Sequence, residues 1–335
     1  MVQLEPVGGG RNSRVYRAAC RSGRRYAVKC YAHHPADERD RLAVEFSSLE
    51  FLRRHGLTNV PRPIAADPAL QCAVYEHIEG DRIPPSSVTA RDIDEVVAFL
   101  TALRALRDRA GSLALPQAAE ACFSIEALTE CITRRLDRLA AATRDGTDEP
   151  HRALQAFLQD AFLQAFEEIK RWCREGLERL GIPGERELAQ EERTLSPSDV
   201  GFHNALRRAG RLVFLDFEYF GWDDPAKLAA DVLLHPAMEL SEALKQRFVS
   251  ELLPRFDAQG GLAERLAIVY PLYGLKWCLI FLNEFVPPDL FRRDFAKQEI
   301  LERDQVQMEQ LAKAQRMLNR IRWEYAYVPY GHRAC

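Results

Sequence analysis

The sequence predicts an α+β fold of two lobes, a small, mostly β-stranded N-terminal lobe with one helix and a large, mainly helical C-terminal lobe. Short β-prone runs joined by turn residues fill the first part of the chain, up to about residue 80. Beyond it, apolar residues recur at helical spacing and only one hairpin interrupts them. Gly80 and the stretch Pro84–Ser87 form the best candidate linker, so we expect lobes at 1–80 and 81–335.

Strands are predicted in the N-terminal lobe at Val15–Ala19, Tyr26–Tyr31 and Gln71–Ile78, where β-prone residues stand between turn signals. Apolar side chains at three- and four-residue spacing predict a helix over Asp37–His55, and Gly56 is placed to end it.

Helices are predicted through most of the C-terminal lobe. Thr89 is placed to cap the first of them, and apolar periodicity marks two more at Ile125–Leu136 and Leu154–Cys173. An irregular segment, Ser196 to Asn204, and a hairpin turning at Ala209–Gly210 come next. Asp224–Pro225 then begins another helix, and helices continue to about Trp323.

Composition excludes several classes of protein. Of the 335 residues 47% are hydrophobic, which is enough for a substantial core. Lys and Arg total 46 against 49 for Asp and Glu, a net charge of −3, which argues against a nucleic-acid partner.

No signal peptide or membrane span is expected. The first ten residues lack a basic start followed by a long apolar run. The most apolar stretch, Leu266–Phe285, contains Pro271 and Lys276, so we interpret it as a buried helix. The eight cysteines include no Cys-x-x-Cys pair, which favours reduced thiols and a cytoplasmic location.

A glycine-rich segment near the N-terminus is a candidate anion-binding loop. Gly8, Gly9 and Gly10 would let backbone N–H groups approach a phosphate closely, and Asn12 and Ser13 follow them. The Ser13 hydroxyl would add a donor. The competing interpretation is a flexible turn.

The next candidate is Lys29, which lies within the predicted strand Tyr26–Tyr31 and is flanked by apolar residues. A strand lysine in such a setting can place its ammonium over the phosphates of a nucleotide, held there by a carboxylate of the following helix. Glu45 is the first candidate for that carboxylate and Glu50 the second. The alternative is a solvent-facing lysine and a surface glutamate.

The strongest pattern is Asp199, then Asn204 five residues later, then Asp216 after a hairpin. In phosphoryl transfer an Asp accepts the proton of the acceptor hydroxyl, while an Asn and a second Asp hold Mg²⁺. Magnesium prefers hard oxygen ligands, which amides and carboxylates supply. The pattern therefore predicts Asp199 as a base and Asn204 and Asp216 as metal ligands.

With these motifs in this order, the sequence resembles the aminoglycoside phosphotransferase and choline kinase superfamily, the small-molecule branch of the protein-kinase-like fold, from end to end. The resemblance implies ATP and Mg²⁺ as cofactors, a phosphate loop at Gly8 to Ser13 and a Lys29–Glu45 pair. Val74 to Gly80 is similar to the segment that borders the adenine, which implies nucleotide contacts at Glu76 and Ile78.

The same resemblance assigns Ser196 to Asn204 to the catalytic loop and Asp216 to Tyr219 to an Asp-x-Glu metal motif, in which Glu218 would assist. The family usually has His two residues before the catalytic Asp, and Pro197 stands there in this chain. This departure motivates an alternative, a non-catalytic nucleotide-binding scaffold. His203 is interpreted as a hydrogen-bonding residue of the loop.

The predicted function is an ATP- and Mg²⁺-dependent phosphotransferase acting on a hydroxyl of a small molecule. A kinase of protein side chains is disfavoured because only seven residues separate Asp216 from Asp224. The acceptor is left open between an amino alcohol such as choline or ethanolamine and a sugar-type molecule. Aromatic candidates for an amine cage are Tyr219, Phe220, Trp222, Tyr270, Tyr273, Trp277 and Phe285, and polar candidates for a sugar site are Trp222, Asp223, Asn283 and Glu284.

Overall fold

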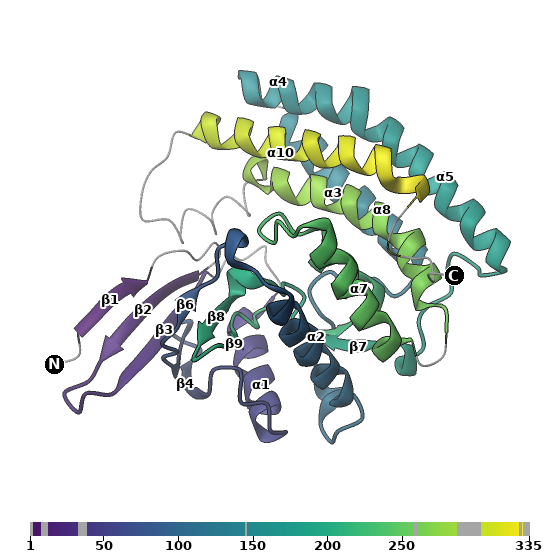
Figure 1. The fold of residues 1–335 in the computed structure, drawn as a ribbon. Coiled ribbons are helices and arrows are strands. Elements are labelled where there is room, and N and C mark those ends of the chain that lie inside the picture. Colours follow the sequence, from purple (N-terminus) through teal and green to yellow (C-terminus); the bar gives the residue numbers. More distant parts are fainter. Residues whose placement is uncertain are drawn as a thin grey trace.

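A computed structural model describes residues 3–7, 13–32, 39–144, 146–257, 260–286, 303–327 and 330 of the chain. The predicted two-lobed α+β fold is confirmed: a β-sheet with one helix occupies one side of the molecule and a large group of helices the other (Figure 1).

Five antiparallel strands build the sheet of the N-terminal lobe, in the order β1-β2-β3-β5-β4. The three predicted strands are among them. β1 and β4 were not predicted, because both are short, contain Pro and lie largely exposed, so they lack the alternation of a half-buried strand. The strands are β1 Gln3–Val7, β2 Ser13–Ala19, β3 Arg25–Tyr31, β4 Pro63–Asp67 and β5 Cys72–Glu76.

The one helix among the described residues of this lobe, α1, spans Arg41–Arg54. It begins later than predicted because Asp40 is its N-cap and accepts a hydrogen bond from the backbone N–H of Ala43 at 2.9 Å. Gly56, with φ of +90°, follows its end as expected. Glu45 lies on the buried face of the helix together with its apolar residues, which directs its carboxylate into the protein.

The C-terminal lobe is mainly helical, and α8 lies at its centre in contact with α3, α5, α6 and α10. The predicted long helix over Leu154–Cys173 is divided into α4, a π-helical segment and α5, which Gly181 ends with φ of +65°. The longer helices are α2 Ala90–Ala105, α3 Ile125–Thr143, α4 Glu149–Ala156, α5 Leu163–Leu180, α6 Pro225–Leu234, α7 Glu242–Phe256, α8 Leu262–Phe281 and α10 Arg303–Glu324. Short helical segments are Pro85–Ser87, Ser112–Ala114, Phe157–Phe162, Gln190–Glu192, Phe202–Asn204, Leu282–Phe285 and Tyr325–Tyr327.

One segment of the described chain, Leu262–Phe285, is long and apolar enough to cross a membrane by length and composition. Its most apolar window is 78% buried inside the protein, as expected of a core helix. This burial agrees with the interpretation of Leu266–Phe285 as a buried helix.

Five short strands lie in the C-terminal lobe: β6 Asp81–Arg82, β7 Thr194–Ser196, β8 Ala205–Arg208, β9 Arg211–Phe214 and β10 Gly221–Asp223. β6 pairs with β8, and β8 with β9. A Cβ on Gly80 would lie 3.0 Å from the backbone oxygen of Arg207, so glycine allows the chain to pass this close to β8. The β8–β9 hairpin begins directly after Asn204 and ends close to Asp216, which brings the two predicted metal ligands toward the same end of the hairpin.

A stability prediction follows from Asp92 at the start of α2. Its carboxylate completes a capping box with Thr89 and accepts two 2.9 Å hydrogen bonds from Arg207 of β8. Asp92→Ala should lower the free energy of unfolding by about 2 kcal/mol, measured by urea denaturation. Asp94→Ala on the same helix is the control, because the Asp94–Arg247 pair is exposed and should contribute little.

The effect of Asp92→Ala should depend on pH. Burial alone would raise the pKa of Asp92, but hydrogen bonds from Thr89 and Arg207 lower it below its ordinary value. A carboxylate with a depressed folded-state pKa stabilises the protein above its unfolded pKa, about 3.9, and loses this contribution as the pH falls through the folded value. The difference between wild type and Asp92→Ala should therefore shrink in acid, and a difference that grows there would contradict this assignment.

Candidate active site

Side chains from three separate parts of the sequence meet at Lys29 of β3. Its Nζ lies 2.6 Å from Oε2 of Glu45 on α1 and 2.6 Å from Oδ1 of Asp216 beyond β9. The carboxylate of Glu218 is the third neighbour, at 3.1 Å. One ammonium is thus surrounded by three carboxylates, and the guanidinium of Arg41 lies 3.8 Å from Glu218. With both cations counted, the cluster carries a formal charge of −1 when all three carboxylates are ionised.

The carboxylates of this cluster stabilise the protonated form of Lys29. Burial alone would lower the pKa of Lys29, but Asp216, Glu218 and Glu45 outweigh it and raise the pKa well above its usual range. Burial raises the pKa of Asp216 and of Glu218, against the opposing effect of Lys29. Lys29 therefore stays protonated. Further positive charge nearby would stabilise the ionised forms of Asp216 and Glu218.

Glu45 is held from several sides. Its Oε2 also accepts a 2.8 Å hydrogen bond from the hydroxyl of Tyr31, which lies 2.7 Å from the hydroxyl of Tyr75. Its Oε1 accepts a 3.2 Å hydrogen bond from the backbone N–H of Phe217. The same carboxylate therefore contacts the sheet of the N-terminal lobe and the segment after β9.

Asp199 lies in the loop after β7 and is also held by donors. Nε2 of His203 lies 3.1 Å from its Oδ1, and Nε2 of His235 lies 3.3 Å from the same oxygen. Burial alone would raise the pKa of Asp199, but hydrogen bonds from the two histidines lower it well below its usual range. Asp199 is therefore a carboxylate at neutral pH.

Backbone conformation in the site is unusual at two positions. Ser198 and Asp216 both have φ of +65°, a left-handed conformation that non-glycine residues adopt rarely. Such conformations persist where surrounding contacts fix them, and they gather at functional sites. The amide nitrogen of Asn204 donates to the backbone oxygen of Asp199 at 2.9 Å, which leaves its carbonyl oxygen as the atom available to a cation.

Comparison with known proteins gives the family. A sequence profile of the phosphotransferase enzyme family matches residues 3–267. The chain belongs to this family. The match confirms the resemblance drawn from the sequence motifs, and it makes the protein a phosphotransferase.

Three solved structures illustrate the shared fold. An ethanolamine kinase from Plasmodium vivax has a TM-score of 0.61 and 12% identity, over 93% of this chain and 82% of that one. The choline kinase of Streptococcus pneumoniae has a TM-score of 0.57 and 17% identity, over 95% and 94%. An ADP-bound aminoglycoside phosphotransferase has a TM-score of 0.57 and 13% identity, over 95% and 94%. No curated protein matches the sequence.

Most of the residues predicted for the site of this phosphotransferase can now be placed. Lys29 contacts Glu45 as expected, while Glu50 is exposed. Ser13 is buried at the start of β2, Glu76 ends β5, and Ile78 follows it half-buried. Four further predicted residues, Gly8, Gly9, Gly10 and Asn12, lie outside the described part of the chain.

The aromatic candidates for an amine cage are mostly core residues. Tyr270 and Tyr273 are 0% and 1% exposed, and Phe220, Trp222 and Phe285 are buried as well. Tyr219 is only half-buried, but the guanidinium of Arg41 lies 5.8 Å from its ring centroid. The helical spacing of Tyr270 and Tyr273 on α8 therefore reflects their packing in the core.

The polar candidates for a sugar site are also engaged inside the protein. Asp223 is fully buried and accepts a 2.8 Å hydrogen bond from Lys227. The indole N–H of Trp222 donates to the backbone oxygen of Ser112 at 3.0 Å, and Glu284 is buried. The side-chain oxygen of Asn283 accepts from Arg135. All four side chains were candidates for contacts with a sugar, and the structure has them in contacts within the protein instead.

Sequence reasoning missed two residues that contact the loop carrying Asp199, namely Lys227 and His235. Lys227 and Asp231 lie on one side of α6, and His235, the residue directly after the helix, continues the same four-residue interval. A polar stripe at this spacing in an otherwise apolar helix was a usable signal, because side chains four positions apart share one face.

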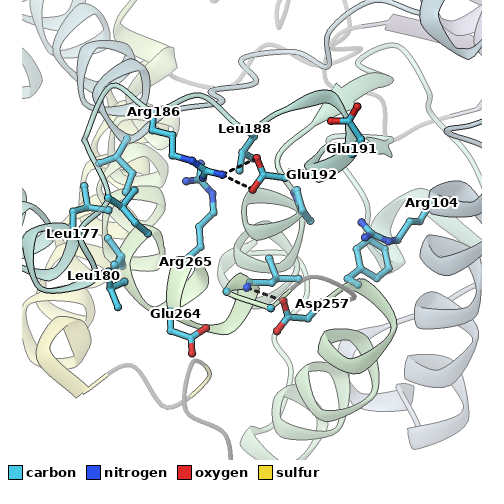
Figure 2. A pocket seen from close by; sticks show the side chains of 18 residues that line it. Arg104, Leu177, Leu180, Arg186, Leu188, Glu191, Glu192, Asp257, Glu264 and Arg265 are labelled. Carbon is cyan, nitrogen blue, oxygen red and sulfur yellow. Dashed lines mark hydrogen bonds and ion pairs between the residues drawn. The ribbon is translucent and has the colours of Figure 1, made fainter.

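A cavity of about 450 Å³ lies elsewhere in the helical lobe, between the ends of α2, α5 and α7 and the start of α8. Figure 2 shows Arg186 directed at Glu192, with which it forms hydrogen bonds of 2.9 and 3.1 Å, and Arg265 beside them. Arg265 is engaged by Asp224, the N-cap of α6, at 2.7 Å. The lining of this cavity includes none of Lys29, Asp199 or Asp216.

Proposed function

We propose that this phosphotransferase is an ATP- and Mg²⁺-dependent kinase that phosphorylates a hydroxyl group of a small molecule. The observation that carries the proposal is the meeting of Lys29, Glu45 and Asp216 at one point, with two 2.6 Å contacts between residues far apart in the sequence. In kinases a Lys–Glu pair orients the nucleotide phosphates beside a metal-binding Asp.

The residues present fit a magnesium nucleotide. Glu45, Asp216 and Glu218 offer oxygen atoms within 4.8 Å of one another and outnumber the two cations beside them, Lys29 and Arg41, so net negative charge remains to attract a divalent cation. Asp216 and Asn204 would hold the metal, with Glu218 assisting. When bound, ATP supplies the phosphoryl group and Mg²⁺ neutralises charge on its phosphates.

We assign the nucleotide contacts to the N-terminal lobe and the acceptor site to the C-terminal lobe. We place the phosphates at residues 8–13 and Lys29, with Gly8, Gly9, Gly10, Asn12 and Ser13 as donors, and the adenine beside Glu76 and Ile78. Residues 1–80 would thus bind nucleotide, while residues 81–335 would carry the catalytic loop, the metal motif and the acceptor site. β6 supports this division, because it pairs with β8 of the C-terminal lobe from residue 81 onward.

The chemical step uses Asp199. Its carboxylate would accept the proton of the acceptor hydroxyl while the hydroxyl oxygen bonds to the γ-phosphorus. The bond between that phosphorus and the β,γ-bridging oxygen breaks, and ADP leaves. The depressed pKa of Asp199 keeps the carboxylate ionised, and therefore able to orient the hydroxyl, throughout the neutral range.

Nucleotide binding gives the first functional prediction. ATP with Mg²⁺ should raise the melting temperature, because a ligand that binds only the folded state stabilises it, by about 2.7 kcal/mol at 100 times its Kd. Lys29→Ala should reduce this shift at equal ATP concentration, measured by differential scanning fluorimetry. Lys170→Ala on α5, which removes a lysine outside the cluster, should retain it. An unchanged melting curve for wild type at millimolar ATP would contradict nucleotide binding.

Turnover with an acceptor tests the function itself. We would measure ADP release with choline, ethanolamine, aminoglycosides, simple sugars and nucleosides as acceptors. The proposed function requires ADP release that depends on one of these classes. ATP binding without turnover on the whole panel would instead support the alternative of a nucleotide-binding scaffold.

A further inference from the structure

The loop that carries Asp199 receives little support from the residue two positions before it. Pro197 has no backbone N–H and no polar side chain, so it cannot donate a hydrogen bond to the loop. Ser198, which follows, adopts a left-handed conformation that needs support from its surroundings. The backbone N–H of Ser198 donates to the hydroxyl of Ser196 at 2.9 Å, and the Ser198 hydroxyl lies 3.3 Å from the backbone oxygen of Ala119. Two further contacts to this part of the loop come from α6 and from the residue directly after it.

The first of these contacts is made by Lys227 in the first turn of α6. Its buried Nζ donates to the hydroxyl of Ser198 at 3.0 Å and pairs with Asp223 and Asp231 at 2.8 and 3.1 Å. Asp231 in turn accepts a 3.0 Å hydrogen bond from the indole N–H of Trp277 on α8. This network ties α6 both to the residue before Asp199 and to the central helix of the lobe.

The second contact is made by His235, directly after the last residue of α6. Its Nδ1 lies 3.1 Å from the backbone nitrogen of Ala237, which can only donate. Nδ1 must therefore be the acceptor, and the ring proton of the neutral imidazole resides on Nε2. Nε2 lies 3.3 Å from Oδ1 of Asp199, so the fixed tautomer presents its N–H to the carboxylate.

The ring of His235 is held between two others. It stacks on His203 with a centroid distance of 4.1 Å and an interplanar angle of 5°, and the ring of Trp277 meets it edge-on at 4.7 Å. A Cβ on Gly201 would lie 2.5 Å from the ring of His203, so glycine is what lets that ring reach the stack. The ring of His203 packs on the face of the His235 imidazole and the ring of Trp277 packs beside it, which holds the imidazole next to Asp199.

We propose that His235 is a positioning residue for the phosphoryl-transfer step: its Nε2–H fixes Oδ1 of Asp199 and leaves Oδ2 as the oxygen that takes the proton. Nε2 of His203 and Nε2 of His235 both approach Oδ1, so the two histidines converge on one of the two carboxylate oxygens. This inference rests on the proposed function, because it gives Asp199 the role of base. His235 acts through Asp199.

The tautomer can be tested without any turnover. Long-range ¹H–¹⁵N correlation spectra of the imidazole rings distinguish a protonated from an unprotonated nitrogen, and the signals lost in His235→Gln identify those of His235. We expect Nε2 to be protonated and Nδ1 to be unprotonated in the wild-type protein at neutral pH. A proton on Nδ1 would overturn the inference whatever the enzyme does.

Kinetics test the consequence for catalysis. His235→Ala should lower kcat by about 10- to 100-fold, because a small displacement of a catalytic group can cost this much. The KM for ATP and the ATP-dependent rise in melting temperature should stay near wild type. His235→Gln, whose side-chain amide can donate at the position of Nε2, should recover most of the loss. His151→Ala is the control, since this half-buried histidine packs on Phe285 outside the loop.

The outcomes separate the inference from the function on which it rests. Wild-type turnover that His235→Ala leaves unchanged would overturn the inference and keep the function. Equal losses in His235→Ala and His235→Gln, together with a lost ATP shift, would indicate a structural role and also overturn it. A wild-type protein that turns over no acceptor on the panel would overturn the proposed function, and the inference with it.

Discussion

Asp199→Asn is expected to lower kcat by two orders of magnitude or more while ATP still stabilises the protein as it does the wild type. The substitution keeps the size of the side chain and removes its charge, so it removes the base that receives the acceptor proton. General-base assistance is typically worth about 10²–10⁴ in rate. Asp199 does not contact the Lys29–Glu45 pair, so nucleotide binding should survive.

The measurement compares kcat on a confirmed acceptor with the ATP-dependent shift in melting temperature. Asp137→Asn makes the same chemical change on the exposed face of α3 and should alter neither quantity. Retained binding with lost turnover would separate chemistry from folding. Turnover by Asp199→Asn near the wild-type rate would instead mean that the catalytic loop is wrongly assigned.

Asp216→Asn is expected to lower kcat/KM by more than about 100-fold. Residues that merely orient metal ligands typically cost 10- to 100-fold when they are mutated, and a charged direct ligand should cost more. Asn tolerates the left-handed conformation of residue 216, so backbone strain does not enter the comparison. The loss should be accompanied by a higher Mg²⁺ concentration for half-maximal activity, measured by Mg²⁺ titration at fixed ATP.

The comparison variant is Asn204→Ala, which removes a neutral ligand. It should cost less than Asp216→Asn, because the amide contributes no net charge to the attraction of the cation. A larger loss from Asn204→Ala would mean that the two roles are exchanged or that the metal lies elsewhere. Unchanged Mg²⁺ dependence in both variants would contradict the metal site.

Local signals in the sequence were sufficient for much of the fold. The N-caps Thr89 and Asp224 predict the starts of α2 and α6. Capping is local, because the side-chain oxygen accepts a hydrogen bond from a backbone N–H only two or three residues later. The Lys29–Glu45 contact was also predictable, since the strand and the following helix keep a short, fixed relation. The choice between Glu45 and Glu50 as the partner of Lys29 depended on which face of α1 is buried.

Other features depend on distant parts of the chain and have no local signal. β6 has only two residues, and its pairing with β8 depends on a segment more than a hundred positions later. His235 contacts Asp199, which lies 36 positions earlier in the sequence. Its tautomer depends on a hydrogen bond from the backbone N–H of Ala237 to its Nδ1, which the sequence does not show. Tyr270 and Tyr273 could not be assigned to the core or to a cage, because spacing on α8 is the same in both cases.

The carboxylate of Glu45 joins the two lobes, because it binds Lys29 and Tyr31 on one side and the backbone of Phe217 on the other. α1 therefore cannot swing outward without breaking contacts that form as the chain folds. In this conformation the Lys29–Glu45 contact is already formed, together with the contact that joins α1 to the segment after β9. Any opening of the lobes about α1 would therefore have to release the buried carboxylate of Glu45 from both sides at once.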